Sequence, residues 1–309
     1  MSAITIGFLE FRDNDFIRSV AAGLSDIPSE FIRTGEFPHP TPPPYRVVVD
    51  RISFCDPFLR QIMRYWSLYG AYVLNNPFFT LVCDKLSELI LYDNLSIRHA
   101  KTVLLPRFNA GEDVKELVAE PDWDAIMDRI RFPCILKPVD GYAWQNVFRV
   151  EDPATLRGIY ESFKDSRTLI VQELIPYVSY YRAFCVGKSD VQIVRWNPKP
   201  FDRGEYSMPD LHELDVVGDV IRDKTLELNA ALGLDFNTVE WCITKEGTPF
   251  VIDSYNDVPD VRREKLPAEC YDWVVDRFCA CVREKLESGA RNVILPSAGW
   301  LSDAGPLPG

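Results

Sequence analysis

The chain has 309 residues, which is enough for two or three compact lobes rather than one small core. Hydrophobic residues make up 47% of it and aromatic residues 12%, so we expect a packed core and not a disordered chain. The net charge of −12 argues against a general nucleic-acid binder or an anionic-membrane binder, because both need a positive surface field. We therefore expect no nucleic-acid and no membrane partner.

The eight cysteines are scattered through apolar runs and form no CxxC pair. A structural zinc site needs clustered ligands, so we expect reduced, buried thiols instead. The first residues lack the basic start and long apolar run of a signal peptide, and no apolar run reaches membrane-spanning length. These features predict a cytoplasmic protein.

In the first third of the chain, strand-like apolar runs alternate with runs of helical spacing. The expected strands are 4–11, 47–49 and 72–74, and the expected helices are 13–24, 57–69 and 78–91. Strands separated by helices favour a parallel sheet of the open α/β kind. The proline-rich segment 38–44 is predicted to be a loop.

From residue 101 onward the pattern is α+β, with closely spaced strands that predict a largely antiparallel sheet. The expected strands are 101–105, 134–137, 168–174, 181–186, 191–196 and a hairpin that starts at residue 240. The expected helices are 114–130, 155–163, 211–232 and 268–286. The tail 297–309 is rich in Gly, Pro and Ser and is predicted to be loose.

The segment 240–256 holds the most informative pattern. Two apolar runs flank a charged turn that contains Gly247, which is typical of a β-hairpin. Antiparallel pairing would bring Glu240, Asp253 and Asn256 to one end. Two carboxylates and a side-chain carbonyl suit Mg²⁺, which leaves its other positions to water and phosphate oxygens. The alternative is a surface hairpin with solvated acids at its base.

Several cationic side chains lie where a phosphate group could be held. Lys137 ends an apolar strand, where it either snorkels to solvent or presents a point cation. Arg182 and Arg195 lie on neighbouring expected strands, and on one sheet face they could clamp phosphate or carboxylate. Either arginine could instead pair with a structural acid. Lys85 falls on the helix expected at 78–91 and indicates nothing alone.

Two further segments could contact a ligand. The loop 140–146 carries Tyr142 and Trp144 and could fold over a bound group, although its single glycine makes it a weak phosphate-binding signal. The strand that ends at Pro176 offers extended backbone groups that could read an adenine edge. An ordinary strand end explains that segment equally well.

Taken in order, these residues resemble the ATP-grasp superfamily, in particular the branch of glutathione synthetases and ribosomal-protein glutamate ligases. The resemblance extends from about residue 47 to about residue 259 and is strongest after residue 132. It implies the ATP-grasp fold, with an N-terminal open α/β lobe and two α+β lobes that sandwich ATP. The implied domains are 1–106, 107–170 and 171–309.

The resemblance also implies a role for each candidate residue. Two lysines would contact ATP phosphates, four residues would form the nucleotide-binding hinge strand with the last three of them at adenine, two catalytic arginines would face phosphate or the substrate carboxylate, and three residues would bind Mg²⁺, with Mn²⁺ as an alternative. In that order the residues are Lys85 and Lys137; Gln172, Glu173, Leu174 and Ile175; Arg182 and Arg195; and Glu240, Asp253 and Asn256.

The chain departs from the family pattern in three places. The family's loop after the second lysine is usually rich in glycine, whereas here it carries Tyr142, Trp144 and Gln145. The acid that often binds ribose after the hinge is missing. The last metal motif has one more residue than usual between Asp253 and Asn256.

The resemblance implies an ATP-dependent carboxylate–amine ligase that forms an amide through an acyl phosphate. Its substrates would be small-molecule or peptide carboxylates and amines, the loop 142–144 would be a lid, and a homo-oligomer is among the expected assemblies. Two alternatives keep the fold. One is a small-molecule kinase similar to the inositol phosphate kinases, and the other is a non-catalytic nucleotide-binding scaffold.

Overall fold

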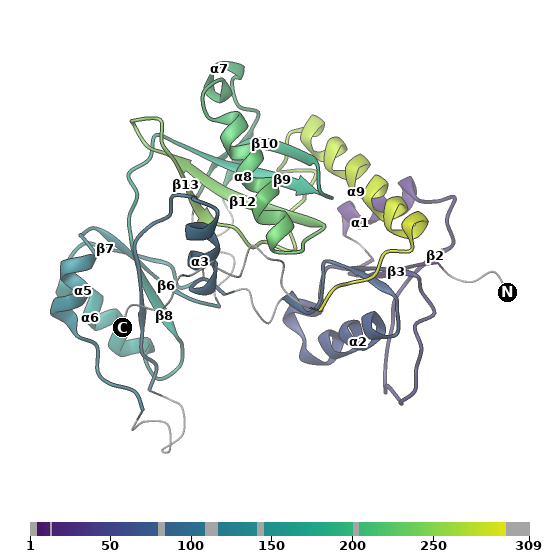
Figure 1. Cartoon of the computed structure of the whole chain (residues 1–309), viewed down its shortest axis with the longest axis horizontal. Helices are drawn as coiled ribbons and strands as arrows, with labels where there is room; N and C mark the ends of the chain where they lie inside the picture. Colours follow the sequence, from purple (N-terminus) through teal and green to yellow (C-terminus); the bar gives the residue numbers. More distant parts are fainter. Residues whose placement is uncertain are drawn as a thin grey trace.

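The computed structural model describes residues 5–12, 14–79, 84–108, 117–140, 145–199 and 204–294. Three sheets organise these residues into lobes (Figure 1). None of the helices described is both long enough and apolar enough to cross a bilayer.

The N-terminal sheet is parallel, with the strand order β2-β1-β3-β4. Its strands are β1 (Ile6–Leu9), β2 (Ser29–Phe31), β3 (Val47–Asp50) and β4 (Tyr72–Leu74), and its helices are α1 (Asp15–Gly23), the 3₁₀ turn η1 (Ser53–Cys55) and α2 (Pro57–Leu68). Asn14 caps α1 by accepting a hydrogen bond from the Ile17 amide at 3.1 Å, and Asp56 caps α2 in the same way. The open α/β lobe predicted from the sequence is confirmed.

The central sheet is antiparallel, with the strand order β5-β8-β6-β7. Its strands are β5 (Thr102–Leu105), β6 (Cys134–Pro138), β7 (Phe148–Val150) and β8 (Leu169–Glu173), and its helices are α5 (Trp123–Arg129) and α6 (Pro153–Phe163). Asp152 caps α6, and Pro153 takes the first helical position, where its missing N–H costs nothing. This lobe has a hydrophobic core of its own, centred on Leu136 and Tyr160.

The C-terminal sheet is antiparallel, with the strand order β11-β10-β9-β12-β13. Its strands are β9 (Ser179–Val186), β10 (Asp190–Asn197), β11 (Glu205–Ser207), β12 (Phe236–Ile243) and β13 (Pro249–Asp253), and its longer helices are α8 (Gly218–Ala231) and α9 (Ala268–Ser288). Helix α8 packs on the face that carries Trp241, while α9 packs on the face that carries Phe184 and also against α1 (Figure 1). The N-terminal and C-terminal sheets therefore share one core.

The predicted bounds of the helix at 78–91 are wrong. Helix α3 (Ser87–Asn94) begins later, because the Asp84 side chain accepts the amides of Leu86 and Ser87 at 2.9 and 2.8 Å and holds a turn. Lys85 lies in this turn and not on a helix. Residues 80–83 of the expected helix lie outside the described residues.

Two other expected helices differ from the structure. In the segment 114–130, helix is found only in α5, where Asp122 caps the N-terminus and the preceding Pro121 is not helical; residues 114–116 lie outside the described residues. The segment 211–232 is divided into α7 (Leu211–Leu214) and α8. The sequence Val216-Val217-Gly218 at the break has low helix propensity, which favours an interruption there.

The sheets also divide the chain differently from the expected domains 1–106, 107–170 and 171–309. Strand β5 pairs with β8 and so belongs to the central sheet, and residue 170 falls inside β8. The short edge strands β2 and β11 were not expected, because three half-exposed residues give no clear alternation. The predicted loose tail 297–309 lies outside the described residues.

Candidate active site

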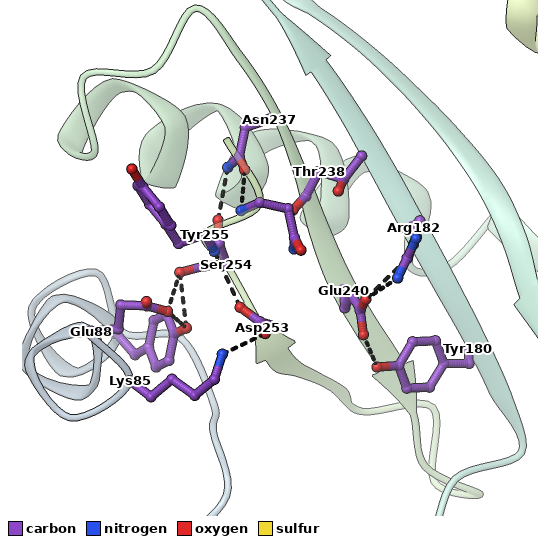
Figure 2. Close-up of polar contacts among 12 residues, drawn as sticks. Lys85, Glu88, Tyr180, Arg182, Asn237, Thr238, Glu240, Asp253, Ser254 and Tyr255 are labelled. Atoms are coloured by element: carbon purple, nitrogen blue, oxygen red, sulfur yellow. Dashed lines mark hydrogen bonds and ion pairs between the residues drawn. The ribbon is translucent and has the colours of Figure 1, made fainter. Parts of the chain in front are cut away.

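The centre of the candidate site is an ion pair between the entry to α3 and the end of β13. Lys85 Nζ donates to Asp253 Oδ2 at 2.8 Å (Figure 2). The two side chains are 18% and 23% exposed, so the pair is largely shielded from water. Burial alone would lower the pKa of Lys85, but Asp253 outweighs it and raises that pKa above its ordinary value.

Glu240 lies directly opposite Asp253 because of a β-bulge. Strands β12 and β13 pair Trp241 with Val251, but the register then shifts and pairs Glu240 with Asp253. Without this extra residue, Glu240 would face Ile252 and Asp253 would point to the other side of the sheet. The bulge therefore places both carboxylates on one face.

Glu240 is held from the side opposite Lys85 (Figure 2). Arg182, its cross-strand partner on β9, donates to Oε1 from Nε at 3.0 Å and from Nη2 at 2.5 Å. The hydroxyl of Tyr180 donates to Oε2 at 2.5 Å. Arg182 stacks on the Trp196 ring at 4.5 Å, which fixes the plane of its guanidinium. The orientation of Glu240 is thus set by two side chains of β9.

Asn256 follows β13 and is positioned by β12. Its amide nitrogen donates to the Thr238 carbonyl at 2.9 Å, which leaves the side-chain oxygen as the end available to a cation. The buried Asn237 accepts the Asn256 backbone amide at 2.8 Å and donates to the Ser254 carbonyl at 2.7 Å. Asn237 therefore holds the segment that carries Asp253 and Asn256 against the sheet.

Lys137 comes from a different lobe, at the end of β6, and lies within electrostatic reach of this cluster. Burial, and then the nearby Lys85, lower the pKa of Lys137 below its ordinary value. Burial alone would raise the pKa of Asp253, but Lys85 and Lys137 together hold it below its ordinary value. Side chains from three separate segments thus converge in one site.

Glu88 is a carboxylate of this site that sequence reasoning missed. It is 3% exposed and accepts hydrogen bonds from the hydroxyls of Tyr92 at 2.7 Å and Ser254 at 2.9 Å (Figure 2). Because Ser254 follows Asp253, this network ties α3 to the end of β13. Burial, and then Asp253, raise the pKa of Glu88. The only signal in the sequence was an acid four residues before Tyr92 in an apolar run.

Tyr180 and Asn237 were also missed. Tyr180 precedes the candidate Arg182 by two residues, so strand alternation places both on one face and could have predicted its contact with Glu240. Asn237 is a fully buried amide in the buried strand β12, and a buried amide by itself indicates a required hydrogen-bond partner.

The structure places Arg182 and Arg195 on different faces of the sheet, so they do not form the clamp that two arginines on one face could provide. In the register of β9 and β10, Arg182 lies opposite Val194 and Arg195 lies opposite Tyr181. Residues directly opposite each other share a face, so the two arginines point to different faces. Arg195 forms an ion pair with Glu213 of α7, away from Glu240. For Arg195 the structure therefore supports the alternative stated above, that the arginine pairs with a structural acid.

The predicted hinge residues run from the central sheet toward the C-terminal lobe. Gln172 donates from its side chain to Thr102 Oγ1 at 2.9 Å, and the Glu173 amide donates to the Lys101 carbonyl at 2.9 Å. Leu174 is partly buried, and Ile175 packs in a small apolar cluster at the base of the C-terminal sheet. The loop residues Tyr142 and Trp144, expected to form a lid, lie outside the described residues.

The donor set of the site fits a hard divalent cation with phosphate oxygens. Two carboxylates and one amide oxygen are the ligands that Mg²⁺ accepts when it keeps open positions for water and phosphate. Lys85, Lys137 and Arg182 are side chains of the kind that bind phosphate oxygens. Among the described residues, no group of three or more His, Cys, Asp or Glu side chains is arranged to hold a metal ion.

Comparison with solved structures shows a shared fold at low sequence identity. A RimK domain protein ATP-grasp from Sphaerobacter thermophilus aligns with a TM-score of 0.62 and 17% identity, covering 90% of this chain and 98% of that one. The D-alanine–D-alanine ligase from Bacillus anthracis aligns with a TM-score of 0.65 and 15% identity, covering 93% and 100%. The ATP-grasp ligase PsnB, complexed with the precursor peptide PsnA2 and AMPPNP, gives a TM-score of 0.60 and 15% identity, covering 91% and 98%.

No protein-family model matches the chain, and the search of curated proteins finds no match. The structural alignments span almost the whole of each compared chain, so the agreement covers all three lobes and not a single sheet. The protein therefore has the ATP-grasp fold.

Proposed function

We propose that the protein is an ATP-dependent carboxylate–amine ligase of the glutathione synthetase and ribosomal-protein glutamate ligase-like branch. The observation that carries the proposal is the convergence of Lys85 and Lys137, from separate segments, on the carboxylates of Glu240 and Asp253. The similar folds support it, because D-alanine–D-alanine ligase and PsnB are ligases.

ATP and Mg²⁺ are the proposed cosubstrate and metal, with Mn²⁺ as an alternative. PsnB has been crystallised with Mg and ADP and with AMPPNP, and the Bacillus anthracis ligase with ATP. In this chain Glu240, Asp253 and Asn256 would hold the metal, which would neutralise charge on phosphate oxygens. Gln172 to Ile175 would lie along adenine, at the junction of the central and C-terminal lobes.

The protein's own side chains position and neutralise the reacting groups. Lys85, Lys137 and Arg182 would face the β- and γ-phosphates and stabilise the charge that develops during transfer. Phosphoryl transfer depends mainly on positioning and electrostatics, so no protein nucleophile is required. A substrate carboxylate oxygen attacks the γ-phosphorus, and the bond to the β-phosphate oxygen breaks to release ADP. An amine then attacks the acyl carbon, and phosphate leaves.

A small pocket beside the site is the proposed place for a substrate group. It lies where β3 and β4 end and is lined by Asp50, Ser53, Asn75 and Asp257, the last of which follows Asn256. Ligands of open α/β sheets bind at the carboxyl ends of the strands. The cavity of about 20 Å³ has room for a group of roughly the size of one water molecule, such as an amine or a hydroxyl.

We also propose substrates, a location and an assembly for the enzyme. The acid and the amine would be small molecules or peptides, and PsnB, which is complexed with a precursor peptide, supports the peptide option. A cytoplasmic location, a homo-oligomeric assembly and a lid formed by the loop 142–144 stay predictions.

The test is Mg²⁺-dependent release of ADP and phosphate from ATP across a panel of acids and amines, with hydroxylamine added to trap the acyl phosphate as a hydroxamate. A ligase gives ADP, phosphate and an amide, and it gives the hydroxamate with hydroxylamine. A stable phosphoester in place of the amide would assign a kinase. Tight ATP binding without any turnover would assign a scaffold. Either of the last two results contradicts the proposal.

A further inference from the structure

Each carboxylate that the proposed function assigns to the metal is paired with a cation that it assigns to phosphate. Lys85 Nζ lies 2.8 Å from Asp253 Oδ2. Arg182 donates to Glu240 Oε1 from Nε at 3.0 Å and from Nη2 at 2.5 Å. Figure 2 shows the two cations approaching the carboxylates from opposite sides.

These pairs are shielded from solvent. The side chains of Arg182 and Glu240 are 14% and 10% exposed, similar to the Lys85–Asp253 pair. Charges that are this deeply placed are screened much less by salt and water than surface charges. Lys137 adds a third cation within electrostatic reach of both carboxylates. A divalent cation that enters alone therefore finds both carboxylates already paired with cations, with little screening around the pairs.

The carboxylates stay in place if the cations leave. Tyr180 donates to the second oxygen of Glu240 at 2.5 Å, and Asn237 holds the backbone that follows Asp253. Lys85 lies in a turn and carries its charge on a flexible four-carbon stem, so its ammonium can move to another anion without moving the chain. Arg182 is held more firmly, because it stacks on Trp196 and donates from Nη1 to the Tyr206 hydroxyl at 2.5 Å, so a triphosphate must replace Glu240 as the acceptor of its remaining N–H groups.

We propose, on the basis of the function proposed above, that the site admits the divalent cation only together with a nucleoside triphosphate. Lys85 and Arg182 act as stand-ins for the metal on Asp253 and Glu240. The triphosphate draws both cations to its own oxygens, and the two carboxylates are then exposed to the metal that the nucleotide carries. Removal of either cation should make the nucleotide-free protein a better metal binder and a poorer nucleotide binder.

The experiment measures Mn²⁺ binding by water proton relaxation, which separates protein-bound Mn²⁺ from Mn²⁺ held by nucleotide in solution. Without nucleotide, the wild type should bind Mn²⁺ at least about tenfold more weakly than Lys85→Met or Arg182→Met, because each variant removes one unit of positive charge a few ångströms from the metal ligands. With AMPPNP the wild type should form the ternary complex, and both variants should bind AMPPNP more weakly than the wild type.

Three variants control for general effects. Lys85→Arg keeps the charge and should keep Mn²⁺ binding weak in the absence of nucleotide. Lys224→Met and Arg277→Met each remove a cation that pairs with an acid elsewhere, at Glu227 and Asp190, and should leave Mn²⁺ binding at the wild-type level. Circular dichroism confirms that each variant is folded before it is titrated.

The outcomes are distinct. The first comparison uses only the wild-type protein. If its affinity for Mn²⁺ is the same with and without AMPPNP, the inference is overturned. Lys85→Met and Arg182→Met with unchanged or weaker Mn²⁺ binding also overturn it, while the proposed function survives if AMPPNP still binds the wild type. Wild-type protein that binds no AMPPNP, with or without Mn²⁺, overturns the proposed function itself.

Discussion

Lys85 and Asp253 are 168 residues apart in the chain, yet their side chains form an ion pair of 2.8 Å. The contact joins the turn before α3 to the last residue of β13, and Lys137 from the central sheet lies within electrostatic reach of it. The two lysines of the candidate site therefore lie outside the sheet that supplies its carboxylates, whereas Arg182 lies on β9 of that sheet. This separation allows each group to be tested by itself.

Lys137→Met should remove the cation contributed by the central sheet. We expect the catalytic efficiency with ATP to fall on the order of 100-fold, because charge that develops on the transferring phosphoryl group loses a preorganised partner. Lys188→Met, in the exposed turn between β9 and β10, is the matched control and should retain activity. The rate of ADP release at several ATP concentrations gives the catalytic efficiency of each variant. Equal efficiencies of Lys137→Met and Lys188→Met would show that Lys137 is not part of the site.

Asp253→Asn should remove a proposed metal ligand and the charged partner of Lys85 together. We expect Mg²⁺-dependent turnover to fall by at least about 100-fold, since charge neutralisation by the metal contributes several kcal/mol. Glu246→Gln removes an exposed acid from the turn of the same hairpin and should have no such effect. Titration of turnover with Mg²⁺ distinguishes lost metal affinity from lost chemistry. Asp253→Asn with the wild-type Mg²⁺ dependence would contradict the assignment.

Arg182→Met and Arg195→Met should differ sharply in ATP turnover, although the two arginines lie on neighbouring strands, β9 and β10. Arg182 holds Glu240 on the face of the site, whereas Arg195 pairs with Glu213 on the other face and is 43% exposed. We expect the first variant to lose most ATP turnover and the second to retain it, with at most about 1 kcal/mol lost in stability from an exposed pair. If Arg195→Met lost turnover but kept normal stability, Arg195 would belong to the site. Our assignment of the site to the sheet face that carries Arg182 would then be wrong.

Asn237→Ala should weaken the fold and the metal site together. The residue is fully buried and accepts the Asn256 amide while donating to the Ser254 carbonyl, so alanine leaves one buried and one partly buried backbone group unpaired. Such groups cost about 1 to 3 kcal/mol each. Urea denaturation should show this loss, and Mn²⁺ affinity in the presence of AMPPNP should fall. Asn197→Ala, at an exposed strand end, is the control.

The buried thiols should make the protein sensitive to alkali. Burial raises the pKa of six cysteines to about 11 or 12, and these are Cys134, Cys185, Cys242, Cys270, Cys279 and Cys281. In the unfolded chain a thiol has a pKa of about 8.5. Between these values the folded protein binds more protons, so this stability is complete below pH of about 8.5 and is lost as the pH rises.

Each thiol contributes a slope of up to about 1.4 kcal/mol per pH unit. Because total stabilities are about 5 to 15 kcal/mol, unfolding in mild alkali is expected. Urea denaturation at pH values from 8 to 10 measures the slope, and Cys185→Ala should reduce it by one thiol's share. A free energy of unfolding that is constant over this range would contradict the prediction.

Local patterns in the sequence predicted most of the secondary structure correctly. Two apolar runs and the turn at Gly247 located the hairpin, and the expected helix 57–69 begins at the same residue as α2, whereas the one expected at 155–163 begins two residues after the start of α6. The errors lie where a side chain competes with the helix, as Asp84 does by accepting two amides before α3. Such competition depends on one rotamer, and hydrophobic periodicity does not detect it.

The sequence by itself determined which groups are available: oxygen donors in one hairpin, lysines and arginines in several separate segments, and an ordered set of motifs that resembles the ATP-grasp superfamily. Only the tertiary structure decided which of those groups meet. A single bulge turns Asp253 to the face of Glu240, and the register of β9 and β10 sends Arg195 to the opposite face from Arg182. The reason is that side chains alternate with a period of two along a strand, so a shift of one residue moves a group across the sheet, and pairing between distant segments sets that shift.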